Sequence, residues 1–244
     1  MMYYELISND HHKNNCALFK CWDNKRNYYK KVSFSEKGNI IIENEKKGYS
    51  WFFNNLLKPD ETILIQNPYF EINIPVFIGK TFPSDATIKG NEVIIEKFIE
   101  FYRRIWFQSE KFVIHGDLAL CNIIFSNSDE PNIIDWEHFH FADFDYFGYD
   151  IINLLFISLH HEFGGIRSIN DDAKKFINKS ITNLFTDVSS TNKIVESPFK
   201  NSSKYLKEYK SRFNLDVPVE SKFVLSRYNG TDLKKLDKLL TGQL

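Results

Sequence analysis

The sequence has few features of a secreted or zinc-stabilised protein. Only three of its 244 residues are cysteines, Cys16, Cys21 and Cys121, and three cysteines do not make a disulfide framework. The first two stand four residues apart, without a second pair or a nearby histidine pair, which is a poor match to the ligand spacing of zinc sites. We therefore expect reduced thiols and a cytoplasmic location.

Long apolar runs and an excess of one charge are also missing. No apolar stretch approaches the roughly 20 residues of a membrane-spanning helix, and the first ten residues lack the basic and apolar regions of a signal peptide. The formal net charge is −1, so no overall field draws the chain to nucleic acid or anionic lipid. We expect neither a membrane span nor a nucleic-acid partner.

Aromatic residues, by contrast, are abundant, with 23 Phe and 12 Tyr, and predict a core rich in rings. The first part of the chain alternates β-prone runs with one helical pattern. The runs over 17–22 and 27–34 flank a D-N-K-R turn and predict a hairpin. A helix is expected over 40–57, weakened in its middle by Gly48, and further strands are expected over 62–66 and 69–82.

A linker over 83–91 separates this part from a mainly helical remainder. We expect Asn91 to cap a helix that runs to Trp106, and Asn170 to cap another. The other expected elements are a strand over 112–114, a strand pair over 122–125 and 132–135, and helices over 150–163, 171–185 and 231–240. The pattern predicts an α+β protein with a small β-rich lobe, residues 1–84, and a larger helical lobe, residues 85–244.

One segment carries most of the chemical information. Residues 115–122 are H-G-D-L-A-L-C-N, and thirteen residues further the chain places Asp135. Phosphoryl transfer from ATP requires a carboxylate that orients the substrate hydroxyl, together with amide and carboxylate oxygens on Mg²⁺. The spacing H-x-D-x-x-x-x-N followed by an aspartate is that of the kinase catalytic loop. It predicts Asp117 as the base and Asn122 and Asp135 as metal ligands, although each alone would be an ordinary turn or cap residue.

With I-I-D-W-E and G-Y-D-I-I-N, this segment resembles the aminoglycoside phosphotransferase and choline kinase branch of the protein-kinase-like fold over residues 112–155. The resemblance implies a bilobal kinase-like fold that uses ATP and Mg²⁺. It also implies that His115 is buried and structural, hydrogen-bonded to the loop backbone. For Asp150 it implies a carboxylate that accepts N–H groups of the catalytic loop; a helix N-cap is the alternative.

The resemblance further calls for a strand lysine that reaches the phosphates and a helix glutamate that pairs with it. Lys30 and Lys31 lie on opposite faces of the predicted strand, so only one can point toward the nucleotide. We choose Lys31 with Glu45 over Lys30 and Glu43, because K-V-S matches the usual end of that strand. A charged strand edge and a solvated helix face are the alternative interpretation.

The first lobe departs from the family. No G-x-G-x-x-G precedes the hairpin, and the candidate phosphate loop over 8–15 has no glycine, which makes close approach of phosphate harder. The adenine-contacting hinge is placed only loosely, between Gly79 and Lys89. These gaps keep a second hypothesis open, that of a catalytically silent pseudokinase that binds a nucleotide or a partner.

The acceptor is expected to be a small molecule. Protein kinases have H-R-D and a long segment that ends in A-P-E, whereas this chain has Gly116 and too short a run between Asp135 and Asp150 to dock a peptide. The predicted reaction is transfer of the γ-phosphate of ATP to a hydroxyl of a sugar, an aminoglycoside or an amino alcohol. Three acidic side chains follow Asp135: Glu137, Asp143 and Asp145. An acidic patch there would favour a polyhydroxylated or cationic acceptor, but we prefer the interpretation that they belong to an exposed loop.

Overall fold

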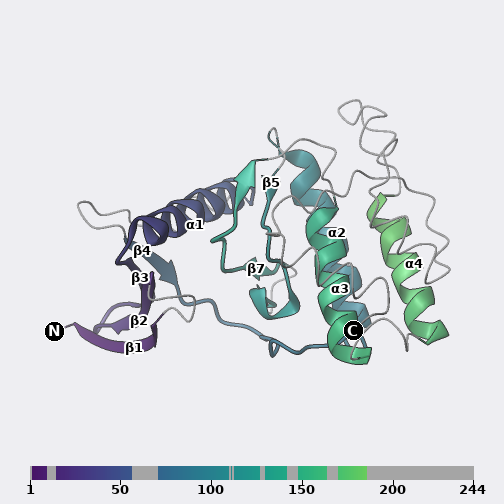
Figure 1. The fold of residues 1–244 in the computed structure, drawn as a ribbon, viewed down its shortest axis with the longest axis horizontal. Helices are drawn as coiled ribbons and strands as arrows, with labels where there is room; N and C mark the ends of the chain where they lie inside the picture. Colours follow the sequence, from purple (N-terminus) through teal and green to yellow (C-terminus); the bar gives the residue numbers. More distant parts are fainter. Residues whose placement is uncertain are drawn as a thin grey trace. The chain divides into compact units, whose positions relative to one another are not determined.

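The structure is a computed structural model that describes residues 2–9, 15–56, 71–109, 111, 113–126, 130–141, 148–163 and 170–185 (Figure 1). The chain forms two compact units. The first comprises Met1–Lys80 and Ile124–His140, and the second comprises Thr81–Ile123 and Phe141–Leu244. Each unit has its own buried core.

The first unit contains a four-stranded antiparallel sheet in the order β1-β2-β3-β4. Its strands are β1 (Tyr3–Asn9), β2 (Cys16–Trp22), β3 (Asn27–Ser33) and β4 (Glu71–Pro75). The hairpin of β2 and β3 confirms the sequence prediction, and the Asp23 carboxylate fixes its turn by accepting the N–H groups of Lys25 and Arg26 at 2.7 and 2.8 Å. Strand β1 was not predicted, and the strand expected over 62–66 lies outside the described residues.

Helix α1 (Glu36–Asn55) packs against β3 and β4 (Figure 1). Ser35 caps it, since its hydroxyl oxygen accepts the N–H of Gly38 at 3.0 Å. Gly48 does not interrupt the helix, contrary to the expected weakness there. It allows Trp136 to approach the helix so closely that a Cβ added at Gly48 would lie 2.5 Å from the Cβ of Trp136.

The Trp136 ring is fully buried and centres an aromatic cluster. Its ring centroid lies 5.5 to 6.5 Å from those of its aromatic neighbours, Tyr49, Trp51, Phe52 and Phe139. Three of these neighbours come from α1, so the cluster attaches the segment around Trp136 to that helix. The abundance of aromatic residues in the sequence correctly predicted a core of this kind.

The helices of the second unit are α2 (Glu92–Gln108), α3 (Tyr149–Phe163) and α4 (Asp171–Phe185). Helix α2 packs against α4, and Lys179 Nζ lies 2.6 Å from Glu96 Oε1 between them. Asn170 caps α4 as predicted, through the N–H of Ala173. Asn91 does not cap α2, which corrects the prediction; its side-chain amide instead donates to the carbonyl of Thr87 at 2.8 Å.

Short elements complete the described chain. They are β5 (Val113–Ile114), the 3-10 turn η1 (Leu120–Asn122), β6 (Ile123–Ile124), β7 (Asn132–Ile133) and β8 (His140–Phe141). Strand β5 pairs with β8, and β6 pairs with β7, which confirms the predicted strand pair. Among the helices that the structure describes, none is long and apolar enough to cross a membrane. The helix expected over 231–240 lies outside the described residues.

Replacing Gly48 with alanine should destabilise the protein. The added methyl group would overlap the Trp136 side chain, and overpacking of this kind costs about 1 to 3 kcal/mol. Urea unfolding measures the effect, with Lys47→Ala as the control because the Lys47 side chain is half exposed on the same helix. A Gly48→Ala protein as stable as the wild type would mean that Trp136 is not held against the helix at this point.

Candidate functional site

The two adjacent lysines of β3 have different partners. Lys31 Nζ lies 3.4 Å from Glu45 Oε2 on α1, and both side chains are largely buried. Lys30 instead lies 3.2 Å from Glu71 at the start of β4. Glu43 is exposed and pairs with Lys47 one turn along α1. The structure therefore brings together Lys31 and Glu45, the pair that the sequence analysis chose.

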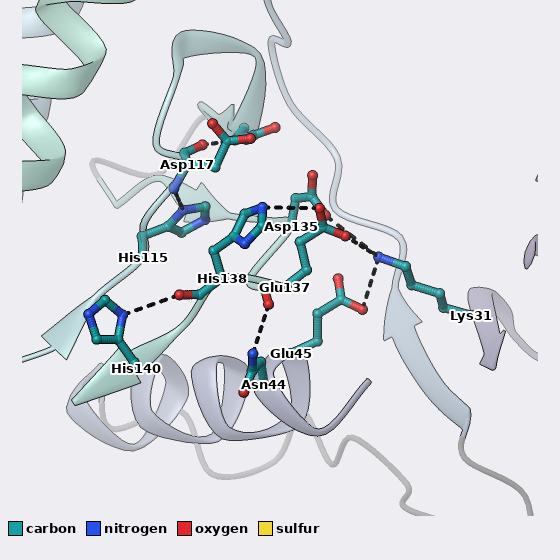
Figure 2. A network of polar contacts seen from close by, with 10 residues as sticks. Lys31, Asn44, Glu45, His115, Asp117, Asp135, Glu137, His138 and His140 are labelled. Carbon is teal, nitrogen blue, oxygen red and sulfur yellow. Dashed lines mark hydrogen bonds and ion pairs between the residues drawn. The ribbon is translucent and has the colours of Figure 1, made fainter. Parts of the chain in front are cut away.

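Two further carboxylates surround the Lys31 ammonium group (Figure 2). Glu137 Oε2 lies 3.3 Å from Nζ and Asp135 Oδ1 lies 3.7 Å away. The Asp135 side chain is 41% exposed, whereas that of Lys31 is 15% exposed. One cation thus contacts three acidic side chains, so the cluster has an excess of negative charge on the side that reaches solvent at Asp135.

This imbalance decides which group holds a proton. Burial alone would lower the pKa of Lys31, but the carboxylates of Glu45, Asp135 and Glu137 outweigh it and raise that pKa. Burial raises the pKa of Glu45 to about 7, because Lys31 offsets it only in part and the other two carboxylates add to it. The raised lysine pKa favours an ion pair, whereas the raised glutamate pKa favours a neutral acid. With three carboxylates for one ammonium, we take Lys31 as charged and Glu45 as the group that titrates near neutrality.

Asp135 has an unusual backbone conformation. Its φ is +65°, and among the described residues it is the one non-glycine position with a positive φ. Aspartate tolerates this left-handed region better than most residues, yet it still costs free energy unless neighbours enforce it. Here the indole N–H of Trp136 donates to the carbonyl of Ile133 at 2.9 Å, and the Trp136 ring is held in the core. The next residue is thus anchored, and the Asp135 side chain is directed toward Lys31.

Glu137 is the residue of this cluster that the sequence analysis misjudged. It was interpreted as part of an exposed loop, but its side chain is only 22% exposed and hydrogen-bonds to Lys31. Its backbone carbonyl also accepts the side-chain amide of Asn44 on α1 at 3.0 Å (Figure 2). The available signal was the D-W-E triplet, where one core tryptophan separates two carboxylates. Asp143 and Asp145 lie outside the described residues.

In the second unit, the loop that carries Asp117 is held through its backbone N–H groups. The buried carboxylate of Asp150 accepts the N–H of His115 at 3.0 Å and that of Gly116 at 2.9 Å. This is the role that the resemblance implied for Asp150. His115 is fully buried, and its Nδ1 accepts the N–H of Asp117 at 3.3 Å, which matches the structural role expected of it.

Asn122 is oriented by the same loop. Its side-chain nitrogen donates to the carbonyl of Asp117 at 2.8 Å, and its amide oxygen accepts the thiol of Cys121 at 3.7 Å. Among the described residues, no group of three or more His, Cys, Asp or Glu side chains could hold a metal ion.

The five residues predicted from the sequence fall into two sets. Lys31, Glu45 and Asp135 come together within the first unit. Asp117 and Asn122 come together within the second, through one hydrogen bond. The candidate phosphate loop lies mostly outside the described residues.

Glu45 should make the stability of the protein depend on pH. Its pKa in the folded protein, about 7, is above the ordinary value of 4.5, so its contribution is complete below about pH 4.5 and is lost as pH rises through 7. Relative to Glu45→Gln, the wild type should therefore lose unfolding free energy across this window. Urea unfolding at pH 5, 6, 7 and 8 measures the difference, with Glu43→Gln as the exposed control. Parallel profiles for the wild type and Glu45→Gln would contradict this assignment.

No protein-family model and no curated sequence matches the chain. Solved structures to which its structure is similar include an aminoglycoside phosphotransferase, a macrolide phosphotransferase and a choline kinase. The aminoglycoside phosphotransferase APH(2'')-Ib with ADP bound has a TM-score of 0.43 and 12% identity, over 98% of this chain and 92% of its own. A macrolide 2'-phosphotransferase type I has a TM-score of 0.41 and 13% identity, over 80% of this chain and 89% of its own. The choline kinase LicA from Streptococcus pneumoniae has a TM-score of 0.41 and 10% identity, over 77% of this chain and 88% of its own.

Proposed function

We propose that the chain is a phosphotransferase that moves the γ-phosphate of ATP, with Mg²⁺, to a hydroxyl group of a small molecule. The observation that carries the proposal is the Lys31 ammonium held between Glu45 and Asp135. A lysine on a strand, fixed by a buried glutamate, supplies the point charge that nucleotide phosphates require. In this proposal residues 1–84 form the nucleotide-binding lobe, and residues 85–244 form the catalytic and substrate-binding lobe.

The metal ligands in this proposal are the oxygens of Asp135 and Asn122. Mg²⁺, when bound, neutralises charge on the phosphates during transfer. A divalent cation at Asp135 would also balance the excess negative charge around Lys31, which is a reason for that excess to exist in a nucleotide site. Because the side-chain nitrogen of Asn122 donates to the Asp117 carbonyl, the amide oxygen is the atom that we propose as the metal ligand.

Asp117 is the proposed catalytic carboxylate. Phosphoryl transfer passes through a loose transition state, in which the attacking hydroxyl needs positioning more than early deprotonation. A carboxylate on a loop whose backbone is hydrogen-bonded to a buried aspartate suits that task. The acceptor class follows from the sequence: Gly116 in place of the arginine of protein kinases, and the short run between Asp135 and Asp150, favour a sugar, an aminoglycoside or an amino alcohol over a peptide.

A silent pseudokinase is the second candidate. The specific observation in its favour is the absence of glycine from residues 8–15, where backbone amides would cradle the phosphates. Such a protein would bind a nucleotide or a partner without transferring phosphate. The next two experiments separate nucleotide binding from transfer.

Thermal unfolding should reveal binding of Mg²⁺-ATP through Lys31. A ligand at a hundred times its Kd stabilises a protein by about 2.7 kcal/mol, so a shift of several degrees is expected for ATP with Mg²⁺ and a smaller one for either alone. Lys31→Ala should abolish the shift. Lys30→Ala is the matched control, because its side chain has a comparable ion pair with Glu71 on the same strand. Equal shifts in both variants would exclude Lys31 from the nucleotide site.

Asp117→Asn should abolish transfer and leave nucleotide binding intact. Loss of a positioned carboxylate typically lowers kcat by about 10²- to 10⁴-fold, while the isosteric amide preserves the loop. ATP consumption is measured against panels of sugars, aminoglycosides and amino alcohols, and the Mg²⁺-ATP thermal shift of the variant serves as the control. Wild-type turnover retained by Asp117→Asn would refute the assignment. A nucleotide-induced shift without turnover on any acceptor would favour the pseudokinase.

A further inference from the structure

Helix α3 buries two polar side chains three residues apart on an apolar helix. Asp150 is fully buried and Asn153 is 5% exposed, while the residues around them, Ile151, Ile152, Leu154 and Leu155, are buried aliphatic side chains. Burial of a polar group costs free energy unless it is hydrogen-bonded. The positions i and i+3 face the same side of a helix, so both groups are directed to one neighbour.

That neighbour is the loop around Asp117. Asp150 accepts the N–H groups of His115 and Gly116, on one side of Asp117. Asn153 Nδ2 lies 3.3 Å from the carbonyl oxygen of Leu118, on the other side, and donates to it. The residue between these contacts is Asp117 itself. Helix α3 therefore holds the backbone immediately before and immediately after the proposed catalytic carboxylate.

The backbone groups of Asp117 are also engaged. Its N–H donates to His115 Nδ1, and its carbonyl accepts from Asn122. Gly116 has a φ of +91°, a conformation that side chains other than glycine rarely adopt. Once this turn and the carbonyl of Leu118 are fixed, the direction in which the Asp117 side chain leaves the loop is set by the backbone.

We infer that Asn153 is a positioning residue, which fixes the carboxylate of Asp117 through the carbonyl of Leu118. The inference rests on the proposed function. Asp150 makes two short bonds with a charged acceptor, so its loss would threaten the fold. The hydrogen bond from Asn153 to the Leu118 carbonyl is longer and neutral, and a bond of this kind contributes only a small part of the stability of a domain. Catalysis is far more sensitive to position than stability is, since a displacement of about 1 Å can cost roughly 10²-fold in rate.

The test compares Asn153→Leu with Asn153→Gln, which keeps an amide donor. The first readout is hydrogen exchange at the amides of residues 113–122, which does not depend on activity. The second is steady-state hydrolysis of Mg²⁺-ATP, with water as the acceptor. Ser158→Ala is the control variant, because Ser158 is also a buried polar residue of α3.

Asn153→Leu should raise exchange in the loop and lower kcat by about 10- to 100-fold, with the KM for ATP within about two-fold of the wild type. Asn153→Gln should recover part of both effects, and Ser158→Ala should change neither. Unchanged exchange in Asn153→Leu would overturn the inference, and so would raised exchange with an unchanged kcat. A wild type that neither hydrolyses ATP nor transfers phosphate to any acceptor of the panels would contradict the proposed function instead, and the exchange readout would still decide whether Asn153 fixes the loop.

Discussion

The Lys31 ammonium group, buried against the Glu45 carboxylate, is the constraint around which the first unit is organised. A charge removed from water must meet an opposite charge at close range, or the fold becomes unstable. This requirement fixes the rotation of α1 about its axis relative to β3, since Glu45 has to face the strand. The same ammonium group also holds the segment that follows β7, because the carboxylates of Asp135 and Glu137 lie within 3.7 Å of it.

The second unit also contains a buried carboxylate, that of Asp150, which is hydrogen-bonded to backbone N–H groups. Asp150 is as deeply buried as Glu45, and its carboxylate accepts the backbone N–H groups of His115 and Gly116. The two carboxylates therefore differ in what they do. Glu45 shares a cluster with other acids and can exchange a proton near neutrality. Asp150 instead accepts the N–H groups of His115 and Gly116, and so it holds the loop around Asp117.

The sequence predicted the parts of this structure that depend on local pattern. The hairpin, helix α1, and helices α3 and α4 follow from alternation, helical period and capping. The pairing of Lys31 with Glu45 was instead implied by the family resemblance, and the structure contains it. The sequence missed what depends on distant residues. Strand β1 has no alternating pattern because its apolar side chains are exposed on both faces. Glu137 looked like a loop residue because its partner, Lys31, is 106 positions away. Asn91 met the local rule for a cap, but its side-chain oxygen accepts no N–H of α2, and its side-chain nitrogen donates to the carbonyl of Thr87.

The contact between Gly48 and Trp136 has a consequence for how the chain is synthesised. The first unit is discontinuous: its core is completed by residues 124–140, which leave the ribosome long after the sheet and α1. Until Trp136 arrives, α1 exposes the apolar side chains that would surround the tryptophan, and such transiently exposed surface promotes aggregation and chaperone binding. A fragment that ends near Lys80 would lack the centre of its own aromatic core, so the first eighty residues are a poor choice for an isolated domain.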